Sequence, residues 1–219
     1  MPEIIAVFAG KPRRLPRPSF ASPGKYWLTS FIKDEVAEPV WLGREGIEGN
    51  RVGDPRVHGG PQQAALFYSA DHYPYWRAEL GLEEMGPGGF GENFSVRGAD
   101  ERDVCIGDRY RAGQALIEVS QPRGPCYKIS WRWQRPDLLS LVEENGRHGW
   151  YVRVLEEGAV TLGDELQLLE RPHAEWTIAD VSRTMRDRKR DRAGAARLAA
   201  VGALSPEWRQ RLWQAVTRG

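Results

Sequence analysis

Residues 115–128 read Ala-Leu-Ile-Glu-Val-Ser-Gln-Pro-Arg-Gly-Pro-Cys-Tyr-Lys, an alternating apolar run that leads into a turn. The alternation over 115–120 predicts a β-strand with one buried face. Two prolines and a glycine then hold Cys126 at a rigid strand end, with Arg123 and Lys128 close in sequence. Neighbouring cations favour the thiolate, the form that attacks electrophiles and binds soft metals. A lone cysteine is also commonly a small buried hydrophobic residue, so this stretch by itself leaves both interpretations open.

Short strand patterns of the same kind recur along the chain and are separated by glycine turns. They cover residues 4–9, 27–32, 36–42, 149–155 and 158–169, with turns at Gly43, Gly46, Gly49, Gly107-Asp108 and Gly163-Asp164. Residues 135–146 instead show apolar positions at helical spacing, a proline near the start and an Asn-Gly stop, which predicts a short helix. Many short strands with few helices predict a mainly β fold, a closed or nearly closed barrel.

The C-terminal part differs in charge and in pattern. From Arg171 onward the chain has eleven basic and five acidic residues, whereas the part before it has 20 basic and 25 acidic residues. A capping-box variant at Thr177–Asp180, a helical run over 193–201 and the start signal Ser205-Pro206-Glu207 predict three short helices. We therefore expect a β-barrel domain over residues 1–170 and a three-helix appendage over residues 171–219.

Composition excludes several classes of protein. Two cysteines, Cys105 and Cys126, are too few for a disulfide framework, which favours a reducing compartment and a cytoplasmic location. No apolar run approaches the length of a membrane span, and no basic segment precedes the first apolar run. The arginine-rich segment 186–192 is interrupted by aspartates, which favours a solvated helix face over nucleic-acid binding.

Three further segments carry candidate site residues. His58-Gly59-Gly60-Pro61 combines a histidine with glycines that let the backbone approach a ligand closely; alone it equally describes a plain loop. Glu92 and Asn93, in a glycine-bracketed turn, are suited to binding a substrate or to capping a backbone. The basic loop 10–18 is stiffened by prolines, so its cations either meet an anion at a pocket rim or face water.

Together these motifs resemble the MOSC domain proteins, and among them the YiiM-like group. The resemblance rests on the features that follow the family's order and spacing. They are His58–Pro61, Phe90–Asn93, Ile106–Asp108, Glu118–Lys128, His148-Gly149-Trp150 and Gly163-Asp164. The three-helix tail is similar to the C-terminal appendage of the YiiM-like group, so the resemblance covers nearly the whole chain.

The resemblance implies a molybdenum cofactor, in which Cys126 would ligate the metal beside the dithiolene of a pterin. Residues expected to hold the cofactor are Lys11, Arg13, His58, Gly59, Arg123, Cys126, Lys128 and Arg153, and those expected to act in catalysis are Cys126, His58, Glu92 and Asn93. The glycine-rich loops and the basic first loop would then be the walls of one anion-receiving pocket, with the cysteine at its floor.

The implied activity is the reduction of N-hydroxylated compounds such as 6-N-hydroxylaminopurine to the amine. The implied partners are a small N-hydroxylated substrate and an electron-donor redox protein, and a homodimer is left open. A cofactor or sulfur carrier without turnover is the alternative within the family. A metal-free cysteine enzyme is disfavoured, since no second cysteine lies at redox spacing and no Cys/His/Asp triad is evident.

Overall fold

The predicted strand at 115–120 lies within a large curled sheet. The computed structural model describes residues 1–21, 23–54, 58–124 and 126–217. In spatial order the eight strands of this sheet are β13 (Leu166–Glu170), β9 (Arg109–Ala112), β10 (Ala115–Pro122), β11 (Trp150–Glu156), β7 (Ala65–Ser69), β8 (Phe94–Arg97), β1 (Glu3–Ala9) and β4 (Asp34–Glu35). Neighbouring strands are antiparallel except β7 and β8, which are parallel.

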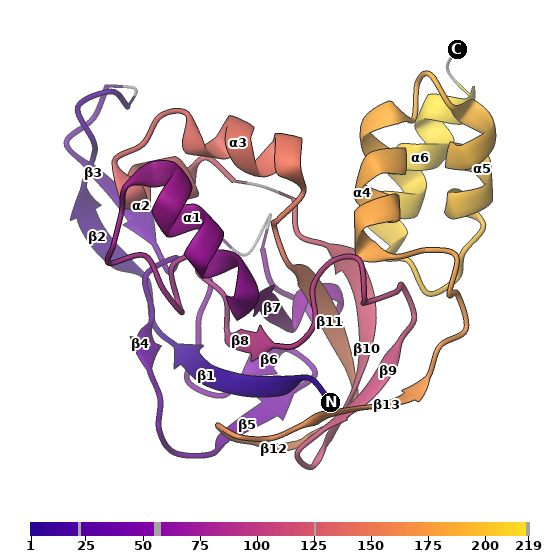
Figure 1. The fold of residues 1–219 in the computed structure, drawn as a ribbon, viewed down its shortest axis with the longest axis horizontal. Helices are drawn as coiled ribbons and strands as arrows, with labels where there is room; N and C mark the ends of the chain where they lie inside the picture. The colour runs from indigo at the N-terminus through magenta and orange to yellow at the C-terminus, as the bar shows by residue number, and fades with distance from the viewer. Residues whose placement is uncertain (22, 55–57, 125, 218–219) are drawn as a thin grey trace.

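The sheet curls until its two ends meet. An isolated bridge joins Glu3 to Glu165, and the Ile4 amide donates to the Asp164 carbonyl at 2.9 Å. These contacts place the start of β1 beside the start of β13, although β13 is the first strand of the order and β1 is the last but one (Figure 1). The predicted mainly β, nearly closed barrel is confirmed, and the near closure leaves few exposed sheet edges.

Two small sheets complete the β structure. One contains β12 (Gly158–Val160), β5 (Val40–Gly43) and β6 (Gly46–Ile47), and the other pairs β2 (Arg13–Pro16) with β3 (Tyr26–Thr29). The expectation of a loop over residues 10–18 is thus wrong for residues 13–16, which form a strand. The local sequence gave no such signal, because β2 is specified by pairing with β3 ten residues away.

The barrel core follows from strand alternation. In β11, Trp150, Val152 and Val154 are buried while the intervening residues are partly exposed. The Phe67 ring stacks between Phe94 and Trp150, at centroid distances of 4.8 and 6.3 Å. Large aromatic side chains from three adjacent strands therefore fill the inside of the sheet.

Short helices cover one end of the barrel. They are η1 (Pro61–Gln63), η2 (Ala70–His72), α1 (Tyr73–Leu80), α2 (Lys128–Trp133) and α3 (Leu138–Asn145). Helix α3 confirms the helix predicted over 135–146, and it is followed by the C-cap residue Gly146, whose φ of 73° lies in the left-handed region. Helix α2 was not predicted. It begins two residues after Cys126, so this thiol lies between a strand end and a helix start.

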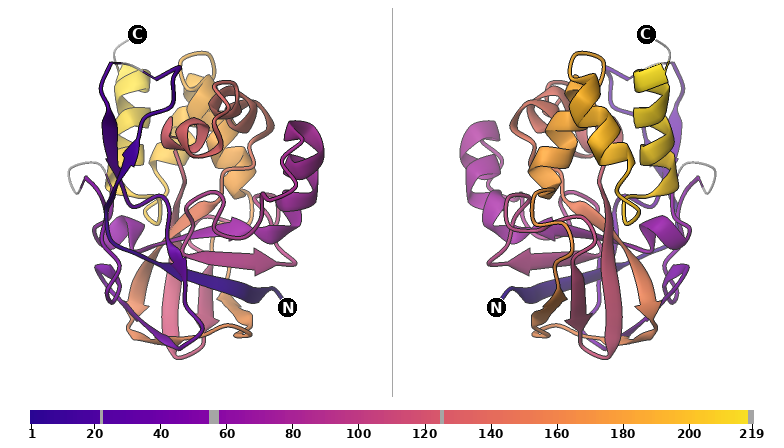
Figure 2. Two further views of the ribbon diagram at one scale, coloured as in Figure 1. Left: turned by 90° about the vertical axis from the view of Figure 1, so that its left-hand side faces the viewer. Right: turned by 90° about the vertical axis from the view of Figure 1, so that its right-hand side faces the viewer.

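The predicted three-helix tail is present as α4 (Ile178–Asp187), α5 (Arg192–Ala199) and α6 (Pro206–Thr217), which stand together beside the barrel (Figures 1 and 2). Thr177 caps α4 through a 3.1 Å hydrogen bond from the Asp180 amide to its hydroxyl, as the capping-box pattern predicts. Buried residues of these helices, including Val181 and Leu212, belong to the same apolar cluster as the barrel interior. Among the described residues no helix has the length and apolar character required to cross a membrane.

Candidate functional site

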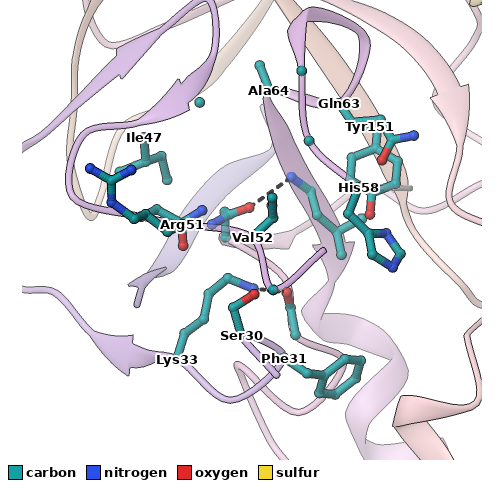
Figure 3. Close-up of a pocket in the computed structure, with 18 of the residues that line it drawn as sticks. Ser30, Phe31, Lys33, Ile47, Arg51, Val52, His58, Gln63, Ala64 and Tyr151 are labelled. Carbon is teal, nitrogen blue, oxygen red and sulfur yellow. Dashed lines mark hydrogen bonds between the residues drawn. The ribbon is translucent and has the colours of Figure 1, made fainter. Parts of the chain in front are cut away.

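A pocket of about 690 Å³ collects residues that are far apart in the sequence. They come from the turn after β3, the loop after β6, the His58–Gly60 turn and the segment around Cys126, and they are joined by residues of β7, of the turn 91–93 and of β11. The predicted site residues that line it are His58, Gly59, Asn93, Arg123, Cys126 and Lys128. Figure 3 shows Lys33, Arg51 and His58 entering this space from different segments. The structure therefore brings most of the predicted site together.

Cys126 is the more accessible of the two thiols. It is half-buried in the pocket wall, whereas Cys105 is 2% exposed. Burial raises the pKa of the Cys105 thiol, and the nearby Asp108 carboxylate raises it further. Cys105 is thus a structural residue, and Cys126 is the thiol that a ligand can reach. The predicted constraint from Pro125 lies outside the described residues.

Arg123 is a buried cation for which the described part of the chain supplies no counter-ion. It is 5% exposed, and its Nη1 atom has no hydrogen-bond partner among the described residues. Its guanidinium lies over the Phe31 ring, 5.5 Å from the centroid. Buried cations are normally paired, so an unpaired guanidinium at a pocket wall has the chemistry suited to an anionic ligand.

Lys33 is a second cation of the pocket that sequence reasoning missed. Its ammonium donates to the Gly91 carbonyl, and the residue directly follows the predicted strand 27–32. Burial lowers the pKa of Lys33 to about 8, against the opposing effect of Glu92 and with a further lowering by Arg123. The Lys33 charge is present below this pH and is lost above it, so anion binding should weaken as pH rises through about 8.

His58 faces the same cations. Burial lowers the pKa of His58, and the positive charges of Lys128 and Arg123 lower it further. The imidazole is therefore neutral near pH 7 and is able to accept a proton or a hydrogen bond. The next two residues, Gly59 and Gly60, have φ values of 83° and 78°, which require glycine.

Glu92 has a different position from the one expected. It is fully buried and does not line the pocket. Its carboxylate accepts hydrogen bonds from the Tyr73 and Ser95 hydroxyls and from the Gly88 and Phe90 amides, the last three at 2.7, 2.8 and 3.0 Å. Of the two roles expected for Glu92, substrate binding and backbone capping, the structure shows the second. Its carboxylate oxygens accept hydrogen bonds from the backbone and side chains of the surrounding loop.

Asn93 lines the pocket but also serves the fold. Its Oδ1 atom accepts from the Leu66 amide and its Nδ2 atom donates to the Phe8 carbonyl, both at 3.1 Å. Because the amide group bridges β7 and β1, its contribution to the pocket is mainly to place the neighbouring backbone.

Three residues that were expected to contact the cofactor, Lys11, Arg13 and Arg153, do not line the pocket. The expectation for these three residues is therefore corrected. Lys11 is exposed, and Arg13 forms an ion pair with Asp34 on the surface. Arg153 donates to Glu118 at 2.8 Å and to a backbone carbonyl near the start of α6 at 2.6 Å. The pairing of β10 with β11 brings Glu118 to Arg153, and the other partners of Arg13 and Arg153 come from segments that are distant in the sequence. The local sequence around these arginines therefore does not reveal that they are engaged.

Comparison with known protein families identifies both parts of the chain. Residues 54–167 match the MOSC domain, and residues 176–212 match the YiiM-like, 3-alpha helix domain. The chain belongs to the MOSC domain family.

Similar proteins cover between 74% and 99% of this MOSC protein. It is 35% identical over 206 residues to YflK, an uncharacterized protein of Bacillus subtilis (strain 168), covering 94% of this chain and 90% of that one. A protein of Gibberella moniliformis (strain M3125 / FGSC 7600) named reductase is 39% identical over 165 residues, covering 74% of this chain and 29% of that protein. The crystal structure of YiiM from Geobacillus stearothermophilus superimposes with a TM-score of 0.83 at 32% identity, covering 99% of this chain and all of that one.

The unpaired guanidinium of this MOSC protein leads to a prediction about ligand affinity. Replacing Arg123 with Met is expected to weaken sulfate binding about 10- to 100-fold, because a charge-assisted hydrogen bond is lost. The free energy of unfolding should stay within about 1 kcal/mol of wild type, since the change removes a buried charge that has no partner. Calorimetric titration with sulfate and urea unfolding measure the two quantities.

Arg153 provides the matched control. Arg153→Met also removes a partly buried arginine, but it leaves Glu118 with Arg109 as its remaining salt-bridge partner among the described residues. It should lower the free energy of unfolding by about 1–3 kcal/mol and leave sulfate affinity unchanged. If Arg123→Met destabilised the protein more than Arg153→Met, Arg123 would have a structural role instead.

Proposed function

We propose that this MOSC protein is a molybdenum-cofactor-dependent reductase that converts N-hydroxylated compounds, such as 6-N-hydroxylaminopurine, to the amine. The main observation behind this proposal is that Cys126 and Arg123 line one pocket, which presents an accessible thiol together with a buried cation whose Nη1 atom has no partner among the described residues. The association of MOSC domains with molybdenum-cofactor binding and the relative named reductase support the proposal.

The side chains of the pocket suit the implied cofactor. The Cys126 thiolate is the soft ligand that the chain offers to molybdenum. Arg123, Lys33 and Lys128 are positioned to bind the phosphate of the pterin through charge-assisted hydrogen bonds. When bound, the cofactor supplies a redox-active metal for electron transfer to the substrate. Neutral His58 is a group of the pocket that is able to accept a proton.

The overall reaction consumes two electrons and two protons. The N–O bond of R–NH–OH breaks, the nitrogen is retained as R–NH₂, and the oxygen leaves as water. The electrons come from a separate electron-donor redox protein, and the protons come from solvent through groups of the pocket. The chain's own tasks are to hold the cofactor, orient the hydroxylamine and deliver protons.

Wild-type protein made in a host that synthesises the cofactor tests this proposal. We expect a stoichiometric amount of molybdenum by elemental analysis, and conversion of 6-N-hydroxylaminopurine to adenine with a reduced viologen dye as electron donor. Protein without molybdenum from such a host would overturn the proposal. Molybdenum without conversion would instead favour the carrier function.

A further inference from the structure

The ribbon formed by β2 and β3 has a concentration of positive charge. Residues 11–33, which include both strands, contain six basic residues and no acidic residue, whereas the whole chain has a net charge of +1. Lys11, Arg14 and Lys25 are exposed. None of these three side chains pairs with a carboxylate in the part of the chain that the structure describes. An exposed surface of one sign attracts partners of the opposite sign, and salt screens this attraction.

The outward face of this ribbon also exposes apolar side chains. Alternation along β3 turns Tyr26 and Leu28 outward, where they are 47% and 56% exposed. In the strand register Leu28 lies opposite Arg14, and Tyr26 lies opposite Pro16. Exposed apolar side chains that are surrounded by charged ones are typical of a surface that contacts another macromolecule.

The inward face of the ribbon connects it to the Cys126 pocket. The Trp27 ring is buried and packs edge-on against Trp131 of α2, with 5.3 Å between the ring centroids. Trp131 in turn contacts Tyr127, at 4.6 Å, and Tyr127 directly follows Cys126 in the sequence. The turn after β3 lines the pocket itself. The ribbon therefore borders the pocket on the side of α2, and the three-helix region lies on the opposite side of the molecule (Figure 1).

Two other occupants of this surface are disfavoured. A second copy of the chain, docked face to face, would place the same cations against one another, because a two-fold interface is self-complementary. It would also gain little from pairing along β2, where Pro16 has no amide hydrogen to donate. Single-stranded nucleic acid binds through bases stacked on open aromatic faces, but the Arg14 guanidinium covers one face of the Tyr26 ring, 4.2 Å from its centroid. An acidic protein surface suits both the cations and the apolar side chains.

We infer that this ribbon is the docking surface for an acidic redox protein that brings electrons to the Cys126 pocket. The inference rests on the proposed function, which requires a separate electron donor, and it identifies the surface and the charge of that donor. With a one-electron carrier, two reduced carrier molecules are oxidised for each N–O bond that breaks. Two protons are taken up, and R–NH₂ and water are the products. Contacts between redox proteins are small and weak, so attraction by exposed cations is expected to determine the rate of encounter.

Turnover of 6-N-hydroxylaminopurine by the molybdenum-loaded protein with two different electron donors tests the inference. One donor is a plant-type 2Fe–2S ferredoxin, a small acidic protein, kept reduced by its own reductase and NADPH. The other is a reduced viologen dye, which needs no docking surface. For the wild type we expect kcat/KM for ferredoxin to fall about tenfold or more between about 0.05 and 0.3 M NaCl, because salt screens the attraction. Dye-driven turnover should change by less than about twofold.

The double variant Arg14→Glu/Lys25→Glu reverses the charge of the ribbon at two exposed positions. We expect its kcat/KM for ferredoxin to be about tenfold or more below that of the wild type. Its dye-driven turnover should be unchanged, because neither side chain lines the pocket. Lys189→Glu/Arg190→Glu is the matched control, with the same change of charge at two exposed residues between α4 and α5. It should behave as the wild type does with both donors, and unfolding midpoints establish that both double variants are folded.

Binding of oxidised ferredoxin to protein made without molybdenum provides a readout that needs no turnover. Calorimetry should show binding by the wild type and the control variant, and binding about tenfold or more weaker by Arg14→Glu/Lys25→Glu. Because this measurement does not depend on the cofactor, absence of dye-driven turnover in the loaded protein counts against the proposed function alone.

Several outcomes would overturn the inference. Equal losses in both double variants would show a general effect of net charge, and loss of dye-driven turnover in Arg14→Glu/Lys25→Glu would show damage to the pocket instead. Salt-independent ferredoxin turnover, or no binding of ferredoxin by the wild type, would also overturn it, and these two tests remain if the variant does not fold. Binding of a single-stranded DNA oligonucleotide that is lost only in Arg14→Glu/Lys25→Glu, while ferredoxin turnover is kept, would assign the ribbon to nucleic acid.

Discussion

Protein carrying Cys126→Ala is expected to contain only background molybdenum when it is purified from a host in which the wild type is fully loaded. The alanine methyl group cannot replace a thiolate as a soft metal ligand. Reduction of 6-N-hydroxylaminopurine should fall to background as well. Because Cys126 is only half-buried in the pocket wall, the free energy of unfolding should change by less than about 1 kcal/mol. Elemental analysis, turnover and urea unfolding of the same preparation measure these effects.

Cys105→Ala is the control for the loss of a thiol. Cys105 lies away from the pocket, where its sulfur is 3.7 Å from the Ala174 carbonyl. This variant should retain the molybdenum and activity of the wild type, with a modest loss of stability from the small cavity. If Cys126→Ala kept both metal and turnover, the cofactor would be held without the thiol and the proposed role of Cys126 would be wrong.

Replacing Glu92 with Ala is expected to lower the free energy of unfolding by about 3–5 kcal/mol, the largest stability effect that we predict. The change removes an acceptor shared by two hydroxyls and two backbone amides in a fully buried site. Each donor left unsatisfied in the interior has a desolvation cost that water no longer offsets. Urea denaturation followed by tryptophan fluorescence measures the loss.

Glu48 supplies a matched carboxylate for comparison. It is exposed at the rim of the pocket, so Glu48→Ala should change the free energy of unfolding by no more than about 0.5 kcal/mol. A Glu92→Ala variant as stable as wild type but inactive would restore the catalytic role that the sequence analysis expected for this residue.

Local sequence patterns determined most of the architecture. Alternation placed β1 and β11, the Asn145-Gly146 stop ended α3, and the Thr177 signal began α4. These signals act within a few residues, through side-chain periodicity, backbone conformation and capping. They are therefore readable without knowledge of the tertiary structure.

Only some of the residues that line the pocket could be predicted from local sequence patterns. His58, Arg123 and Cys126 stood out because glycines, prolines and a lone thiol mark constrained loops, and the structure brings them to one pocket. Lys33 carried no local signal, and its place in the pocket depends on the turn that follows β3. Helix α2 was missed for a similar reason, since its tryptophans are held by packing against other segments.

By itself the sequence determined that this chain is a barrel with a three-helix tail and one conspicuous cysteine. The tertiary structure decided which charged groups remain available to a ligand. Arg153 and Glu92 are engaged by partners that strand pairing and loop folding bring to them, whereas Arg123 Nη1 has no hydrogen-bond partner in the part of the chain that the structure describes. The physical reason is that an ionic or hydrogen-bonding partner depends on which distant segments become neighbours in the fold. Local sequence patterns do not determine which segments these are.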